Sequence, residues 1–206
     1  MSGLFITMEG IDGSGKTTQI NLLNDYFKQK GFDVVLVREP GGTIISEKIR
    51  EIILDIKNKD MTYVTEALLY AASRAQLVAQ VIVPAIKKGA IVLCDRFVDS
   101  SIVYQGVARD LGVDVIKNIN NVATGGLQPD ITFFLDLQYK EAIKRKKEQK
   151  KLDRLESEKE LFYKNVYNGY KMLLDENDNR IKNIDATLPI EDIYEKIKNE
   201  IEKFLI

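Results

Sequence analysis

Residues 10 to 17 combine the residue types that bind a chain of phosphates. They read Gly-Ile-Asp-Gly-Ser-Gly-Lys-Thr and match the phosphate-loop pattern G-x-x-x-x-G-K-[ST]. In such a loop, glycines let backbone N–H groups approach phosphate oxygens, the lysine brings a positive charge to the outer phosphates, and the threonine hydroxyl can bind Mg²⁺. The pattern therefore predicts a site for nucleotide phosphates and Mg²⁺. Its residues are Gly10, Ile11, Asp12, Gly13, Ser14, Gly15, Lys16, Thr17 and Thr18.

The segments on either side of this loop predict a strand and a helix. An apolar run, residues 4–8, precedes the loop. Apolar side chains recur at helical spacing from Thr17 to Lys30, and Gly31 follows as a stop signal. A strand before the loop and a helix N-terminus after it aim backbone N–H groups at phosphate. This context excludes a chance glycine-rich turn.

An aspartate and an arginine follow the apolar run 91–94. A carboxylate at the end of such a strand is the usual partner of a phosphate loop, because it reaches Mg²⁺ or its water shell across the sheet. Asp136 also ends an apolar run, but only Asp95 is followed by an arginine, Arg96. Since a guanidinium can neutralise the charge on a phosphoryl group in transfer, we favour Asp95 and Arg96 as the second part of the site.

Residues 38–43, Arg-Glu-Pro-Gly-Gly-Thr, predict a shaped turn after another strand. Pro40 restricts the backbone of Glu39, and the two glycines permit positive φ angles. Ligands of open α/β sheets bind at this edge of the sheet. An ordinary strand-to-helix turn is the alternative interpretation, because turn chemistry alone also selects Pro and Gly.

Short apolar runs alternate with longer helical stretches along the chain. Most of these runs are almost continuously apolar, which is typical of parallel strands that helices cover on both faces. The pattern predicts a doubly wound, three-layer α/β fold with a five-stranded parallel sheet. The expected strands are Leu4–Met8, Asp33–Arg38, Ala90–Asp95, Asp130–Leu137 and Arg180–Asp185.

The longest predicted helix runs from Thr62 to Lys88. Thr62 is its expected N-cap, Gly89 its stop signal, and Pro84 the source of a kink near its end. We find no internal repeat and no break in composition, and therefore expect residues 1–206 to form one domain.

Composition restricts the class of protein. The 206-residue chain has 30 Lys and Arg against 31 Asp and Glu, so no overall positive field draws it to nucleic acid or membrane. It has no histidine, which excludes His-based acid/base catalysis and His-ligated metal sites. Its single cysteine, Cys94, lies in an apolar run and fits a reducing cytosol. Without a signal-peptide pattern or an apolar run near about 18 residues, we expect a cytoplasmic protein that binds neither nucleic acid nor membrane.

Three classes of P-loop protein can be compared with these motifs. A regulatory GTPase needs the guanine-reading pattern N-K-x-D, and residues 58–61, Asn-Lys-Asp-Met, fail at its fourth position. An ATP-binding assembly protein is disfavoured by the second set of acidic and basic residues at the same sheet edge. A P-loop kinase for another nucleoside or nucleotide is the serious alternative, because its phosphate loop and Asp95-Arg96 pair would look much the same.

The chain resembles the bacterial thymidylate kinases along nearly its whole length. The motif at residues 95–106, D-R-x-x-x-S-S-x-x-Y-Q-G, is the most specific part of the resemblance, since other P-loop kinases share the phosphate loop alone. The resemblance implies phosphorylation of dTMP to dTDP with ATP and Mg²⁺, by a cytoplasmic homodimer. The segments that carry it are 9–19, 38–43, 68–74, 95–106, 152–154 and 184–187.

The same resemblance implies roles for residues on the acceptor side. Arg74 and Gln105 would read the thymine edge, and Tyr70 would stack on the base. Tyr104 would lie under the deoxyribose, where it would crowd a ribose 2′-OH, and Ser101 would also contact the substrate. An arginine and an amide suit a neutral pyrimidine, because they provide a donor for a carbonyl and a group that both donates and accepts. For Arg74, a surface position on the long helix is the alternative.

Further roles concern the phosphates and the metal. By resemblance, Asp12 would bind the sugar 3′-OH, Arg38 and Arg96 the acceptor phosphate, and Glu39 and Asp95 the metal side, together with Thr17. The residues expected to act in catalysis are Lys16, Arg38, Asp95, Arg96 and Arg154.

A basic segment at about residues 144–156 resembles the lid of this family, which closes over ATP. Because no basic residue precedes Lys16 within the phosphate loop, the lid must deliver a cation. Gln149 occupies the position where we expect arginine, which leaves Arg145, Lys147 and Arg154 as candidates. We expect Arg154 to act on the phosphates and Arg145 to stack on adenine. A solvated helix face is the alternative reading of this charge cluster.

Overall fold

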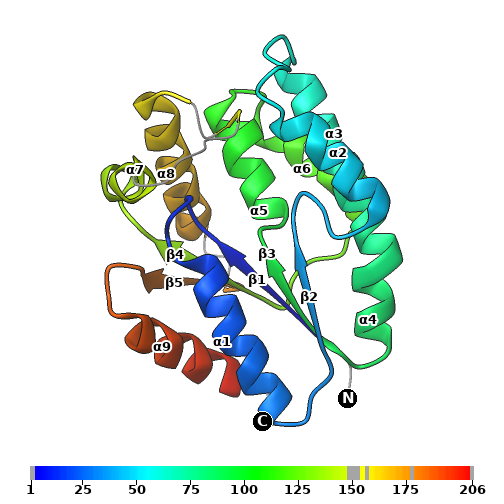
Figure 1. Cartoon of the computed structure of the whole chain (residues 1–206), viewed down its shortest axis with the longest axis vertical. Coiled ribbons are helices and arrows are strands. Elements are labelled where there is room, and N and C mark those ends of the chain that lie inside the picture. Colours follow the sequence, from blue (N-terminus) through cyan, green and yellow to red (C-terminus); the bar gives the residue numbers. More distant parts are fainter. Residues whose placement is uncertain (1–2, 148–153, 156–157, 177–178, 205–206) are drawn as a thin grey trace.

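The computed structural model describes residues 3–147, 154–155, 158–176 and 179–204 (Figure 1). Its centre is a five-stranded parallel sheet with the order β2-β3-β1-β4-β5. The strands are β1 Leu4–Glu9, β2 Val34–Arg38, β3 Ile91–Asp95, β4 Ile131–Asp136 and β5 Ile181–Asp185. Each expected strand is present, with ends that differ by at most one residue from those predicted. The predicted three-layer α/β fold is confirmed.

The position of each strand explains its composition. The three central strands β3, β1 and β4 are buried along almost their whole length, as their continuous apolar runs predict. The edge strands β2 and β5 are partly exposed and include polar or charged residues such as Lys182 and Asn183. Because β1 lies between β3 and β4, the turns that follow β1 and β3 meet at one carboxyl edge.

Helices cover both faces of the sheet (Figure 1). The chain moves outward from β1 to β2 and returns from β2 to β3, so right-handed connections place helix α1 on one face and the helices before β3 on the other. Helix α9 packs beside α1, while α2 packs against α3 and α3 against α6. The bounds are α1 Lys16–Gln29, α2 Ile44–Leu54, α3 Tyr63–Leu77, α4 Val83–Lys87, α5 Val98–Ser101, α6 Val113–Thr124, α7 Tyr139–Lys147, α8 Glu160–Asp175 and α9 Ile190–Glu202.

The long predicted helix is present but changes its winding. Thr62 caps it by accepting a hydrogen bond from the backbone N–H of Thr65, and Gly89 follows it with a φ of 83°. Between α3 and α4, residues Val78–Ile82 form the π-helical segment η1. Pro84 has no N–H to donate to the preceding turn, which gives a local reason for the altered hydrogen bonding. A second π-helical segment, η2, spans Ile102–Ala108.

The helical stretch Tyr63–Lys87 is also long and apolar enough to cross a membrane by length and composition. Core helices of soluble proteins pass the same test, and one third of its apolar window is buried inside the protein. Glu66 and Arg74 of this stretch are both buried. Their burial among protein partners, described below, fits a helix that belongs to the core.

The core consists of the inner strands and the apolar sides of the helices that pack on them. Phe5, Phe27, Phe97, Phe133 and Phe134 are among its largest buried side chains. Cys94, in the apolar run that forms β3, is also buried. Of the predicted lid, residues 148–153 and 156–157, including Gln149, lie outside the described residues.

Candidate functional site

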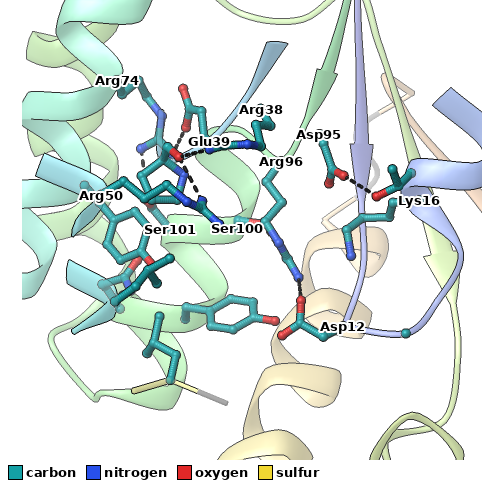
Figure 2. Close-up of a pocket in the computed structure, with 18 of the residues that line it drawn as sticks. Asp12, Lys16, Arg38, Glu39, Arg50, Arg74, Asp95, Arg96, Ser100 and Ser101 are labelled. Atoms are coloured by element: carbon teal, nitrogen blue, oxygen red, sulfur yellow. Dashed lines mark hydrogen bonds and ion pairs between the residues drawn. The ribbon is translucent and has the colours of Figure 1, made fainter. Parts of the chain in front are cut away.

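A cavity of about 500 Å³ opens at the carboxyl edge of the central strands (Figure 2). It extends from the phosphate loop after β1, past the turns after β2 and β3, to side chains of α3 and η2. The structure therefore brings the separate motifs together in one place. The predicted residues in its wall are Asp12, Gly13, Gly15, Lys16, Thr17, Thr18, Arg38, Glu39, Tyr70, Arg74, Asp95, Arg96, Ser101, Tyr104 and Gln105.

The phosphate loop has the backbone that its glycines predict. Gly10, Gly13 and Gly15 all have positive φ, at 142°, 83° and 95°. A Cβ atom at Gly10 would lie only 2.8 Å from the backbone oxygen of Leu135, so β4 approaches the loop too closely for any side chain there. Gly15 adopts the left-handed conformation as the N-cap of α1, which leaves the first N–H groups of that helix open to a ligand.

Lys16 is buried inside this loop. Its Nζ donates to the backbone oxygens of Gly10 and Ile11, each at 3.1 Å. Burial, helped by the charge of Arg96, lowers the pKa of Lys16 to about 8, although Asp95 and other acids oppose the shift. A phosphate group that enters the loop would give this ammonium an anionic partner and favour its charged form.

Thr17, in the first turn of α1, lies beside Asp95, the last residue of β3. The Thr17 hydroxyl donates to Asp95 Oδ2 at 3.0 Å. A hydroxyl and a carboxylate in contact beside a phosphate loop can provide two oxygens for Mg²⁺, with phosphates and waters completing its shell. The described residues contain no group of three or more His, Cys, Asp and Glu side chains that could hold a metal alone.

Arg96 stands between the phosphate loop and the rest of the cavity. Its backbone has a φ of 70°, unusual for a residue other than glycine, which turns the side chain back over the loop. Its guanidinium donates to Asp12 Oδ1 at 2.6 Å and to the Ser100 hydroxyl at 3.0 Å, and lies 5.2 Å from the ring centre of Tyr104. Nearby acids and tyrosines keep its pKa well above the ordinary value despite burial. It is a fixed positive charge.

Arg74 is held at the far side of the cavity. It is only 1% exposed, so the alternative of a surface position is wrong. One Nη atom donates to the Ser101 hydroxyl at 2.9 Å and to Asn120 Oδ1, and the other donates to the backbone oxygen of Phe97 at 2.9 Å and pairs with Glu39. These contacts fix the guanidinium before any ligand arrives.

Glu39 turns toward Arg74 rather than toward Thr17 and Asp95 (Figure 2). Burial raises the pKa of its carboxyl to about 7, although Arg74 opposes the shift. Its expected role as a metal ligand stays a prediction, and this structure gives it an ion-pair role instead.

The remaining acceptor-side residues surround a space between Arg74 and Arg96. Tyr70 lines it from α3, and Tyr104 and Gln105 line it from η2. Tyr104 is buried, and among the described residues its hydroxyl has no hydrogen-bond partner. Aromatic rings, a buried arginine and an amide are the groups that bind a flat heterocycle.

The sequence of this chain matches thymidylate kinases. The sequence model of the thymidylate kinase family matches residues 8–197. A thymidylate kinase of Exiguobacterium sp. is 51% identical over 197 residues, which cover 96% of this chain and 93% of that protein. Those of Caldanaerobacter subterraneus subsp. tengcongensis and Thermosipho africanus are 49% and 50% identical, over 100% and 98% of this chain and 98% and 99% of their own length. The chain belongs to the thymidylate kinase family.

Within this thymidylate kinase fold, two predicted lid cations take different places. Arg145 Nη1 donates to the backbone oxygen of Gly13 at 3.2 Å, so this side chain lies against the phosphate loop. Arg154 instead donates to the backbone oxygen of Ile53 at 2.8 Å and to Glu66 at 2.7 Å, beside the acceptor side of the cavity. The structure therefore does not bring Arg154 to the phosphates, where we expected it to act.

Arg38 lies at the rim of the cavity. Its Nη1 donates to the backbone oxygen of Pro40 at 2.7 Å and its Nη2 to Glu47 at 2.9 Å, with about half of the side chain exposed. Arg50 of α2 donates to the same Pro40 oxygen at 2.9 Å and also lines the cavity. Sequence reasoning missed Arg50, because a single arginine on a helix carries no motif.

Glu9 is a second residue that sequence reasoning missed. It is buried at the end of β1, and its carboxylate accepts hydrogen bonds from the backbone N–H of Phe97 and from the hydroxyls of Ser100 and Tyr170, at 2.7, 2.5 and 2.9 Å. Burial raises the pKa of this carboxyl. Glu9 ties the strand before the phosphate loop to the turn that carries Arg96. Its position directly before the loop was the available signal.

Proposed function

We propose that this site transfers the γ-phosphoryl group of ATP to dTMP and so makes dTDP and ADP. The match to thymidylate kinases along residues 8–197 carries the proposal. The geometry supports it, because a phosphate loop and a pocket for a flat base open into one cavity. A nucleotide at each end would place donor and acceptor phosphates near Arg96.

On the donor side, the phosphate loop binds the phosphates of ATP through its backbone N–H groups and Lys16. Thr17 and Asp95 provide oxygens for Mg²⁺, which neutralises charge on the phosphate oxygens when it is bound. Arg145 supports the same end of the site, since it already touches the loop at Gly13. We propose Arg145 as the lid cation that acts on the phosphates.

On the acceptor side, Arg74 and Gln105 bind the edge of thymine while Tyr70 stacks on its face. Arg38 and Arg96 bind the phosphate of dTMP. The contact of Arg96 with Asp12 supports a place for the sugar 3′-OH beside that pair. Because these groups are held by other residues before binding, little freedom is lost when the substrate enters.

Phosphoryl transfer needs charge neutralisation more than acid/base chemistry, since the phosphoryl group carries its charge on its outer oxygens during transfer. Lys16, which phosphate binding keeps protonated, and Arg96 on the other side supply positive charges at that point. The cavity thus positions two phosphates and stabilises the charge between them.

A kinase for another nucleotide is the alternative, and one assay separates the two. ADP release is measured by a coupled assay with ATP, Mg²⁺ and a panel of nucleoside monophosphates. We expect dTMP to be the preferred acceptor. Equal rates with purine acceptors, or turnover of ATP with none of the panel, would overturn the assignment.

The role of Gln105 is tested by Gln105→Ala. Loss of its contact with thymine should lower kcat/KM for dTMP by about 1–3 kcal/mol in transition-state terms, with ATP binding nearly unchanged. An equal loss for both nucleotides would indicate structural damage instead.

We also propose that the chain acts as a cytoplasmic homodimer, as its family resemblance implies. Large apolar side chains are exposed on three neighbouring helices, α2, α3 and α6, and their burial against a second copy would explain them.

A further inference from the structure

Glu66 of α3 gathers side chains that come from distant parts of the chain. It is completely buried and lies behind the wall of the cavity. Its Oε1 accepts from Gln105 Nε2 at 3.0 Å and from Arg109 Nε at 3.3 Å. Its Oε2 accepts from Arg109 Nη2 at 3.3 Å and from Arg154 Nη2 at 2.7 Å. One carboxylate thus receives four N–H groups.

This arrangement decides which end of the Gln105 amide faces the cavity. An ionised carboxylate can only accept hydrogen bonds, so it selects the NH₂ end of the amide. The opposite orientation would place the Gln105 carbonyl against the Glu66 carboxylate. A buried hydrogen bond would then be lost, and two acceptor oxygens would face each other. Gln105 is 1% exposed and no donor among the described residues reaches its Oε1. The carbonyl oxygen is left as the group that the amide offers to a base.

A carbonyl acceptor at this place distinguishes pyrimidines by their ring nitrogen. Thymine and uracil carry a hydrogen on N3 and can donate it to Gln105. Cytosine has a lone pair on N3 and would meet the carbonyl with a second acceptor. A site rejects a ligand more strongly when the ligand leaves a buried polar group of the site unpaired than when the ligand differs only in size.

We propose that Glu66 is a positioning residue that sets the base preference of the site by fixing the Gln105 amide with its carbonyl toward the acceptor base. Glu66 acts through Gln105 and does not touch the substrate. The inference rests on the proposed role of Gln105 in reading thymine.

The surroundings of Glu66 determine how it can be tested. Arg109 is also buried, pairs with Glu158 at 2.6 Å, and lies 4.6 Å from the ring centres of Tyr63 and Phe162. Removing the charge of Glu66 leaves Arg109 with Glu158 as its acidic partner among the described residues. The isosteric change Glu66→Gln is therefore the mildest informative substitution.

The test compares kcat/KM for dTMP with kcat/KM for dCMP. In Glu66→Gln, the new amide can donate to Gln105, so that Gln105 can turn its NH₂ toward the base. We expect the ratio of dTMP to dCMP to fall about 10-fold or more. Glu158→Gln is the matched control, because it removes a carboxylate from Arg109 without touching Gln105. Its ratio should stay at the wild-type value.

A second variant restores the negative charge that Glu66→Gln removes, and so covers the case in which loss of that charge prevents folding. The double change Glu66→Gln with Gln105→Glu keeps the total charge, lets position 66 donate to position 105, and leaves a carboxylate oxygen facing the base. We expect it to retain the preference for dTMP. A folded double variant that accepts dCMP as well as dTMP would overturn the proposal.

Failure of the proposal and failure of the assigned function give different results. If Gln105→Ala lowers kcat/KM for dTMP but Glu66→Gln leaves the ratio unchanged, Gln105 reads the base without help from Glu66. If Gln105→Ala has no effect on dTMP, the base-reading role itself is wrong, and the inference falls with it.

Discussion

Arg96 shows how a single residue joins the two halves of this site. Its left-handed backbone costs energy for a residue with a side chain, and such strain persists where the surroundings fix it. Here the surroundings are a backbone hydrogen bond to Met8, an ion pair with Asp12 and the ring of Tyr104. The strained turn thus aims a guanidinium at the place where phosphates would meet.

Lys16 should take up a proton when ATP binds. Its pKa is about 8 without ligand, because burial disfavours its charge. Phosphates stabilise the charged form and raise this pKa, so proton uptake should grow from pH 7 to pH 9 and ATP affinity should fall above pH 8. Calorimetry in buffers of different ionisation enthalpy measures the uptake. Lys16→Met is the control without this group, and absence of uptake at pH 9 in the wild type would contradict the prediction.

Glu39 should make stability depend on pH in the acidic range. Its pKa rises from 4.5 to about 7 on folding, chiefly through burial. The folded state therefore holds a proton that the unfolded state has lost, and the free energy of unfolding should decrease as the pH rises from about 4.5 to 7. The decrease is roughly 3 kcal/mol for this group.

Glu39→Gln isolates that effect from other acids. Urea unfolding of both proteins across this pH range gives the difference in their free energies of unfolding. We expect the wild type to lose stability relative to the variant as the pH rises. A constant difference would show that folding leaves the pKa of Glu39 unchanged.

At the scale of residues, motifs within one segment were predictable and contacts between segments were not. The phosphate loop and Asp95-Arg96 could be found because short patterns carry their chemistry. The role of Glu66 could not be predicted, because it depends on contacts with Gln105, 39 residues away, and with Arg154. The buried pairing of Arg74 with Glu39 likewise needs the fold to bring two turns together.

Among the elements, the central strands were predictable because burial on both faces makes their sequences continuously apolar. The edge strands were found from their shorter apolar runs and the turns beside them. The π-helical segments were not foreseen, since periodicity alone does not distinguish them from α-helix. Of the functional elements, the lid was recognised as basic, but the sequence did not show which end of it reaches the phosphate loop.

The two described lid arginines should differ in their effects on the chemical step. Arg145 contacts the phosphate loop at Gly13, whereas Arg154 is bound to Glu66 and Ile53. A cation delivered to the transferring group is typically worth about 10³–10⁵ in rate. We therefore expect Arg145→Ala to slow single-turnover transfer far more than Arg154→Ala does.

Lys144→Ala is the matched control on the same helix, because Lys144 is exposed and adjacent to Arg145 in the sequence. It should transfer phosphate at nearly the wild-type rate. If Arg154→Ala proves the slower variant, the lid moves on binding and the role expected from the sequence is restored to Arg154.

At the scale of the whole molecule, the distribution of charge suits anionic ligands that bind in the cavity. The net charge is −1, yet the cavity contains Lys16, Arg38, Arg50, Arg74 and Arg96. Positive side chains concentrated in one cleft attract anions there without making the entire surface attract nucleic acid. Two nucleotides of high negative charge are suitable occupants. That residues 1–206 form one domain stays a prediction.

The exposed apolar residues on α2, α3 and α6 follow the helical repeat. Ile45 and Ile52 on α2, Val64 and Leu68 on α3, and Val115 and Val122 on α6 are each spaced by four or seven residues, so each pair lies on one side of its helix. Because α3 packs against both α2 and α6, three apolar stripes lie on neighbouring helices. A second copy of the chain is the occupant that the family resemblance indicates.

A charged residue introduced into this exposed apolar surface should prevent the two copies from associating. Leu68 is 51% exposed on α3, and Leu68→Lys would bury an unpaired ammonium between two copies, at a cost that opposes association. Ile190 of α9 is 49% exposed and lies on a different helix layer, beside α1, so Ile190→Lys is the matched control. We expect sedimentation velocity to show a dimer for the wild type and for Ile190→Lys, and a monomer for Leu68→Lys with its fold retained. A monomeric wild type would remove the dimer from the proposal, while a dimeric Leu68→Lys would place the interface on another surface.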